Sequence, residues 1–336
     1  MINKKTKFCK AAALLGAAVM MISALAGCGK NTKVVLTAGL KKNEVFRISS
    51  ASCVLPEVMV YLTNMQNQYE SVYGSQIWNA SDGQLSLEQE EREQVLTQLA
   101  RIKVMNLLAQ KKEVTLDDKE KERAAAAGRE YFTSLNSAEV TALNVTQDLI
   151  TKMYEEYALA EKVYQTIVEN VNPEVSDDEA RTITVDMIRV SDSAKASQVL
   201  GKAKEEGVDF ETLAQAESED QTVMQSFGKG EVSEALEKAA FNLGKDEISD
   251  VVESDGSYYI LKCISTFDEA QTKANKEKIV KQRQSEAFDT EYTAFEQTLV
   301  RQLNEKLWDS VTMIHQDDVK TSSFFEVYQM YFQHQE

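Results

Sequence analysis

Proline, histidine and cysteine are scarce in this chain of 336 residues, which holds two prolines, two histidines and four cysteines. Both histidines, His315 and His334, lie near the C-terminus. Chemistry earlier in the chain would therefore have to proceed without imidazole as an acid, a base or a metal ligand. The chain also has only 13 glycines, none of them after Gly256. Because glycine and proline weaken helices, this favours long helices on both sides of a loop-rich middle segment.

Positive charge is in short supply as well. Lysine and arginine number 37 against 54 acidic residues, which gives a net charge of −17. This balance argues against nucleic-acid binding, because phosphate contacts need clustered positive charge. No spacing of acidic residues suggests a metal cage and no glycine-rich loop suggests a phosphate site, so we expect no metal and no cofactor. The 43% of hydrophobic residues is typical of a globular protein rather than a disordered chain or a multi-span membrane protein.

The N-terminus has the pattern of an export signal. Four lysines fall within the first ten residues, and the run 11–25 is apolar but too short to span a membrane. The sequence Leu25-Ala26-Gly27-Cys28 resembles the lipobox of bacterial lipoproteins. The resemblance implies removal of residues 1–27 and acylation of Cys28, which would anchor the protein at the extracytoplasmic face of the cell membrane. A plain secreted protein with a chance cysteine is the alternative.

Residues 28–173 are expected to form an N-terminal helical domain. A β-prone run at 45–48 precedes four amphipathic helical patterns. Their expected N-terminal signals are one of Ser49, Ser50 and Ser52 for the first helix, the capping box Ser86 and Gln89 for the second, Thr115 with Asp118 for the third, and Asn144 for the fourth. The fourth pattern ends where Asn172 and Pro173 break the helix.

The pattern changes after this break. Alternating apolar residues predict a strand over 183–190, and a second strand is expected over 258–264. Between them the sequence predicts helices at 194–206, 210–216 and 235–241, with a loop reaching Gly230 between the last two. This order indicates a compact α+β domain over residues 174–267 with a small antiparallel sheet.

Helical spacing resumes over residues 268–336, where apolar residues recur from Ile279 to Leu303. We expect this segment to pack on the N-terminal helices and complete their domain. The α+β domain would then be an insertion within a mainly helical domain. The aromatic tail over 324–332 is either a docked final helix or an exposed partner-binding surface, and docking is favoured.

Several short motifs of the middle domain occur in the order and spacing of a known family. They are Val185-Asp186-Met187-Ile188-Arg189-Val190, Ser218-Glu219-Asp220, Phe227-Gly228-Lys229-Gly230, Ala239-Ala240-Phe241-Asn242-Leu243-Gly244 and Tyr259-Ile260-Leu261-Lys262. This segment resembles the parvulin-type peptidyl-prolyl cis-trans isomerases, and the whole layout resembles PrsA-like foldase lipoproteins. The second resemblance implies that the helical domain of residues 28–173 is chaperone-like.

The resemblance implies a set of site residues, three of them catalytic. Asp220 matches the Cys or Asp at the centre of the family's site, whereas Met187 and Tyr259 stand where the family has histidines. The residues implied to bind a prolyl ring are Met224, Phe227, Val232, Leu236 and Phe241. With both histidines replaced, we expect weak isomerase activity or none. The alternative is that these residues only fill the core of the domain.

The resemblance favours a membrane-tethered folding factor that assists exported proteins, with unfolded or partly folded polypeptides as partners. The alternative is a non-catalytic holdase or scaffold that uses the parvulin-like domain for peptide binding. A solute-binding lipoprotein would need two α/β lobes, which this sequence does not offer. The sequence leaves a monomer and a homodimer open.

Overall fold

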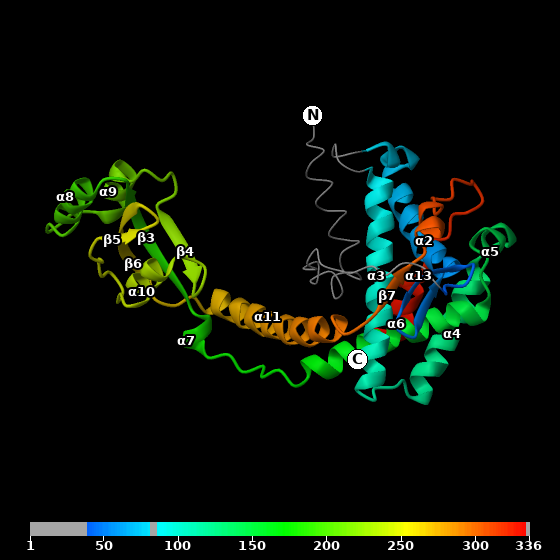
Figure 1. Ribbon diagram of the computed structural model, residues 1–336. Coiled ribbons are helices and arrows are strands. Elements are labelled where there is room, and N and C mark those ends of the chain that lie inside the picture. Colours follow the sequence, from blue (N-terminus) through cyan, green and yellow to red (C-terminus); the bar gives the residue numbers. More distant parts are fainter. Residues whose placement is uncertain (1–38, 81–85, 334–336) are drawn as a thin grey trace. The chain divides into compact units, whose positions relative to one another are not determined.

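The computed structural model describes residues 39–80 and 86–333. The predicted signal peptide and Cys28 lie outside the described residues. Within the described ranges, no helix is both long enough and apolar enough to cross a membrane. The chain divides into two compact units (Figure 1). The helical unit combines residues up to Asn170 with those from Ser285 onward, and the inserted unit is Val171–Gln284.

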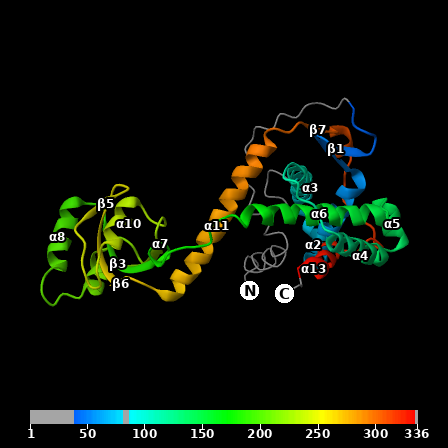
Figure 2. The same cartoon turned by 90° about the horizontal axis from the view of Figure 1, so that it is seen from below.

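Most elements of the helical unit are helices, and their bounds differ from the expected ones in places. They are α2 (Leu55–Tyr73), the 3-10 helix η1 (Ser75–Asn79), α3 (Leu87–Lys111), α4 (Asp118–Ser134), α5 (Ser137–Leu143), α6 (Gln147–Val168), α12 (Glu305–Asp309) and α13 (Phe324–Phe332). Helix α11 (Glu269–Glu296) contributes its C-terminal part. Figure 2 shows these helices from a second direction.

A small antiparallel sheet joins the two sequence segments that form the helical unit. It consists of β1 (Glu44–Ile48), β2 (Ala51–Val54) and β7 (Arg301–Leu303), in the order β2-β1-β7. The prediction that Ser49, Ser50 or Ser52 caps the first helix is wrong, because the chain turns back at Ser49, which has φ 50°, and Ser52 lies in β2. The helix begins after Val54 instead. Leu303 was expected to continue a helix, but pairs with Phe46 in this sheet.

The capping predictions for the later helices have mixed outcomes. The box of Ser86 and Gln89 is confirmed, with the Ser86 side chain accepting a hydrogen bond from the Gln89 backbone. The third helix is capped by Asp117 rather than Thr115. The fourth expected helix does not start at Asn144, which takes a left-handed conformation between α5 and α6.

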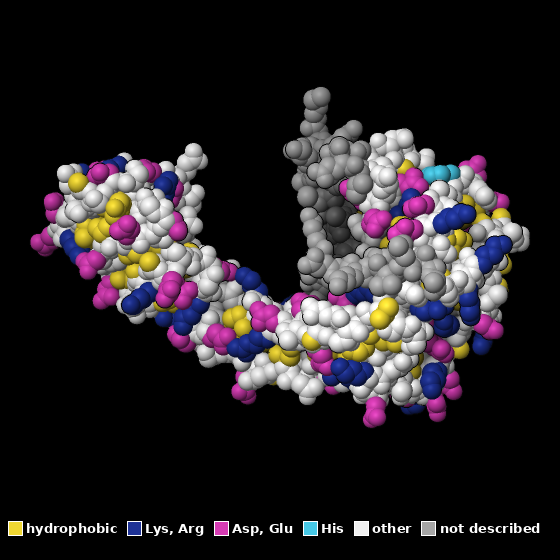
Figure 3. Space-filling view, in the orientation of Figure 1, with side chains coloured by type: hydrophobic (Ala, Val, Ile, Leu, Met, Phe, Trp, Pro, Cys, Tyr) yellow, Lys and Arg dark blue, Asp and Glu magenta, His cyan; other side chains and the backbone are white. Residues whose placement is uncertain are grey.

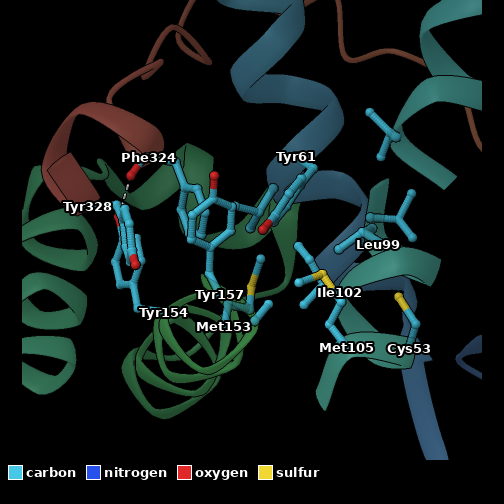
Figure 4. Close-up of a cluster of buried hydrophobic side chains, with 14 of the residues drawn as sticks. Cys53, Tyr61, Leu99, Ile102, Met105, Met153, Tyr154, Tyr157, Phe324 and Tyr328 are labelled. Atoms are coloured by element: carbon cyan, nitrogen blue, oxygen red, sulfur yellow. Dashed lines mark hydrogen bonds between the residues drawn. The ribbon is translucent and has the colours of Figure 1, made fainter. Parts of the chain in front are cut away.

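The aromatic tail is docked in the core of the helical unit, as the sequence favoured. Helix α13 contacts α2 and α4, and Phe324 is fully buried. The Phe324 ring stacks on Tyr154 with centroids 4.5 Å apart, and the Tyr154 hydroxyl donates a hydrogen bond of 2.8 Å to the Phe324 carbonyl oxygen (Figure 4). Tyr328 donates a hydrogen bond of 2.6 Å to Glu161 on α6. Aromatic stacking and satisfied hydroxyl groups together stabilise this docking.

Three helices of this unit meet at a buried group of charges. The Lys103 Nζ on α3 lies 2.6 Å from Glu57 on α2 and 2.5 Å from Glu156 on α6. The Lys103 side chain is 2% exposed. Burial acts to lower the pKa of Lys103, but the two carboxylates outweigh it and raise this pKa above the usual value. We call these three residues the Lys103 cluster.

The inserted unit is an α+β structure, which confirms the predicted fold class. Its elements are α7 (Asp177–Ala180), β3 (Thr182–Val190), α8 (Ser193–Ala203), α9 (Phe210–Glu217), β4 (Met224–Gly228), α10 (Glu234–Phe241), β5 (Val252–Ser254), β6 (Ser257–Ser265) and the first part of α11. The antiparallel sheet has the order β4-β3-β6-β5. The two central strands are those predicted from alternation, whereas β4 lies where a loop was expected.

The two faces of this sheet carry separate apolar clusters. On one face, Ile188 and Ile260 pack with residues of α8 and α9. On the other face, Val185 and Leu261 pack with residues of α10. Because side chains alternate along a strand, each residue of β3 belongs to one face by its position alone. We call the second side the α10 face.

Candidate functional site

Strand register brings two of the predicted catalytic positions onto one face of the sheet. Met187 on β3 pairs with Leu261 on β6, and Arg189 pairs with Tyr259. Directly paired residues in an antiparallel sheet share a face, so all four lie on the α10 face. Met187 and Tyr259 both pack against the apolar cluster of that face. The two positions where the resemblance implies histidines are therefore diagonal neighbours.

Asp220 joins this group through Arg189. The Arg189 Nε donates a hydrogen bond of 2.8 Å to the Asp220 Oδ1. The turn that carries Asp220 is also fixed to the strand by its backbone, because Glu219 N donates to Arg189 O at 2.8 Å and Arg189 N donates to Ser218 Oγ at 3.1 Å. The side chains of Arg189 and Asp220 are 29% and 34% exposed, so both remain accessible from solvent.

Four of the five predicted prolyl-binding residues gather in the apolar cluster of the α10 face. Phe227 and Leu236 are buried, at 7% and 8% exposure, whereas Val232 and Phe241 are partly buried. The rings of Phe227 and Phe241 meet edge to face with centroids 6.3 Å apart. Val232 and Phe241 thus offer apolar surface, and the two more buried residues support it from below.

Met224 does not belong to this group, so its assignment as a pocket residue needs correction. It pairs with Asp186, which lies on the opposite face of the sheet from Met187, and it is 59% exposed. The expectation rested on a loop before Phe227. That segment is the strand β4, where alternation sends Phe227 to the α10 face and Met224 to the other.

Arg189 is a functional candidate that the sequence analysis quoted only as part of a strand. Besides Asp220, its guanidinium lies 3.4 Å from the Ser257 Oγ and 3.9 Å from the Glu219 carboxylate. The hydrogen bond that Arg189 donates to the Asp220 carboxylate raises the pKa of Arg189 above its usual value. Strand parity would have found it, because Arg189 follows Val185 and Met187 at steps of two and is a charged residue on an otherwise apolar face.

Comparison with known proteins identifies the fold of this segment. Residues 161–278 match the family described as the PPIC-type PPIASE domain. The predicted resemblance to parvulin-type isomerases is confirmed. The matched range contains Met187, Asp220 and Tyr259, together with every apolar residue of the α10 face discussed above.

Curated relatives agree with this match. The foldase protein PrsA of Streptococcus pneumoniae strain Hungary19A-6 is 31% identical over 165 residues, which cover 44% of this chain and 53% of the relative. The chain thus spans about half the length of the curated relatives it matches.

Two solved structures illustrate the wider similarity. PrsA from Bacillus cereus has 19% identity and a TM-score of 0.39, covering 72% of this chain and 91% of its own. A SurA-like chaperone from Campylobacter jejuni has 10% identity and a TM-score of 0.31, covering 78% and 99%.

Proposed function

We propose that this protein is a lipid-anchored extracytoplasmic folding factor whose inserted unit binds proline-containing segments of exported polypeptides and weakly accelerates their cis-trans isomerisation. One observation carries the proposal. Within a segment that matches a PPIC-type domain, one face of the sheet carries both Arg189 with its partner Asp220 and Tyr259, and the partly exposed apolar residues Val232 and Phe241.

The chemistry asks little of the protein. The X-Pro bond must cross a barrier of about 18 to 20 kcal/mol, but no covalent intermediate and no net proton transfer is needed. In our proposal Val232 and Phe241 hold the prolyl ring, supported by Phe227 and Leu236. Asp220 and the Tyr259 hydroxyl lie near the amide as it twists, with Met187 beside them. Each tenfold acceleration requires about 1.4 kcal/mol of selective stabilisation of the twisted state.

We assign the remaining parts of the chain to tethering and client binding. Residues 1–27 would be removed and Cys28 acylated, which holds the mature protein at the extracytoplasmic membrane face. Segments 28–173 and 268–336 would supply the helical part that receives unfolded exported chains, and 174–267 the isomerase part. The name of the curated relatives, foldase protein PrsA, supports the assignment of a folding role.

A second candidate function is a holdase or scaffold without isomerase activity. The burial of Phe227 and Leu236 favours it, because side chains that are more than nine-tenths covered cannot grip a prolyl ring directly. In this version the α10 face binds extended segments weakly and the helical unit prevents aggregation.

One comparison separates the two candidates. Prolyl cis-trans exchange in short Xaa-Pro peptides is measured by NMR with the full chain and with Asp220→Ala. We expect acceleration by the unchanged protein and a fall of about tenfold in the variant. Asp250→Ala serves as the control, because Asp250 also pairs with a cation, Lys204, but is 90% exposed elsewhere on the inserted unit. Suppressed aggregation of an unfolded client without any exchange would support the holdase and contradict the isomerase.

A further inference from the structure

Arg189 forms hydrogen bonds with several residues of the candidate site, through both its side chain and its backbone. Its side chain bonds Asp220 at 2.8 Å and Ser257 at 3.4 Å, and its backbone bonds both Ser218 and Glu219. One residue of β3 thereby joins the turn after α9 to the first residue of β6. Hydrogen bonds between a guanidinium and a carboxylate are among the stronger ones in proteins and fix direction as well as distance.

The position of Asp220 depends on this contact. Asp220 lies in the segment between α9 and β4, and its side chain is partly exposed. Without an ordering partner, such a side chain samples several rotamers. The neighbouring Glu219 is held separately, since it accepts hydrogen bonds from the Ser191 backbone and hydroxyl at 3.1 and 3.0 Å.

The charges around Arg189 also indicate that it holds Asp220 in place. Arg189 faces two carboxylates, those of Asp220 and Glu219, and the more distant Lys195 also acts on Glu219. If the guanidinium were absent, two adjacent acids would repel each other at the centre of the site. Because Glu219 is tied to Ser191, Asp220 would be the group that moves away.

We propose that Arg189 is a positioning residue of the candidate site, which holds the Asp220 carboxylate next to β3 and thereby compensates for the family histidines that Met187 and Tyr259 replace. The inference rests on the proposed function. It adds that activity and peptide binding depend on Arg189 through Asp220, and not through general stability.

The experiment compares Arg189→Met, Arg189→Lys, Asp220→Asn and the double variant Arg189→Met/Asp220→Asn in the full chain. Prolyl exchange on an Xaa-Pro peptide is one readout. The side-chain Nε–H resonance of Arg189 is the other, because it reports the contact itself whether or not the protein is active. Lys204→Met, which removes an exposed cation from the same unit, is the control.

We expect Arg189→Met to lower the acceleration about tenfold and Arg189→Lys to restore part of it, since lysine keeps the charge but not the planar fork. In the Asp220→Asn background, Arg189→Met should have no further effect. The Nε–H resonance should shift in Asp220→Asn, and Lys204→Met should match the unchanged protein.

Two results would overturn the inference: an unchanged Arg189 Nε–H resonance in Asp220→Asn, or equal losses from Arg189→Met with and without Asp220. Failure of the proposed function looks different. If the unchanged protein does not accelerate exchange, isomerase activity is refuted. The Nε–H shift in Asp220→Asn, together with the affinity of each variant for the Xaa-Pro peptide, then decides whether Arg189 orders Asp220 for binding.

Discussion

Two groups of charges in this protein have similar composition but different surroundings. The Lys103 cluster lies inside the helical unit, with Lys103 and Glu57 almost fully covered. The pair of Arg189 and Asp220 links β3 of the inserted unit to the turn after α9, and its side chains are 29% and 34% exposed. Burial makes the first a structural group, because Lys103 and Glu57 are almost fully covered and each would lose its charged partner in the core. Partial exposure leaves the second available to a peptide and makes it less important for stability.

The surface around both units has a plain role. On the side seen in Figure 3, acidic and basic side chains are interspersed over the described residues of each unit. On this side no single sign of charge dominates either unit, so the two groups compared above stand out by their contacts rather than by charge density.

The largest effect is expected from removing the buried cation. Lys103→Met leaves the Glu57 and Glu156 carboxylates in the core without their shared partner, so the free energy of unfolding of the helical unit should fall by about 3 to 5 kcal/mol. Denaturant titration measures it. Lys152→Met is the matched control, because Lys152 pairs with the same Glu156 at 3.4 Å from a half-exposed position. Equal losses of unfolding free energy in Lys103→Met and Lys152→Met would contradict the conclusion that burial makes Lys103 the more important partner.

An intermediate effect is expected at Glu161, where burial raises the pKa of the carboxyl above 4.5 although the hydroxyl of Tyr328 acts to lower it. The folded state then binds more protons than the unfolded state. The contribution of Glu161 to the free energy of unfolding is therefore fully present below pH 4.5, and it is lost as the pH rises from 4.5 through the raised pKa. Glu161→Gln should remove this part of the pH dependence and keep the tail docked. Thermal unfolding over a pH series checks it, and an unchanged slope in the variant would contradict the assignment.

The smallest change in stability is expected from the exposed pair. Arg189→Met should lower the free energy of unfolding of the inserted unit by less than about 1 kcal/mol, because solvent screens the lost attraction. The same denaturant titration measures this loss, so the free energies of unfolding of Arg189→Met and Lys103→Met can be compared directly. A loss of several kcal/mol would show that Arg189 belongs with the structural group.

Much of the architecture could be predicted because it depends on local patterns. The alternation at 183–190 and the Ser86 and Gln89 box both describe contacts within a few residues, and both are confirmed. The short strands β2, β4, β5 and β7 were missed, because strands of three to five residues owe their formation to partners distant in sequence. That omission misplaced Met224, since the face of a residue in β4 depends on its register against β3.

The sequence by itself determined the class of the inserted domain, the matched motifs and the position of Asp220 within them. These follow from residue spacing and local periodicity, which need no knowledge of distant partners. Only the tertiary structure decided that Phe324 is docked, that Leu303 closes a sheet with Phe46, and that Arg189 is the partner of Asp220. Each of these contacts joins segments separated by whole helices or by a whole domain. Such pairings depend on how the chain packs in three dimensions, which a pattern of neighbouring residues does not contain.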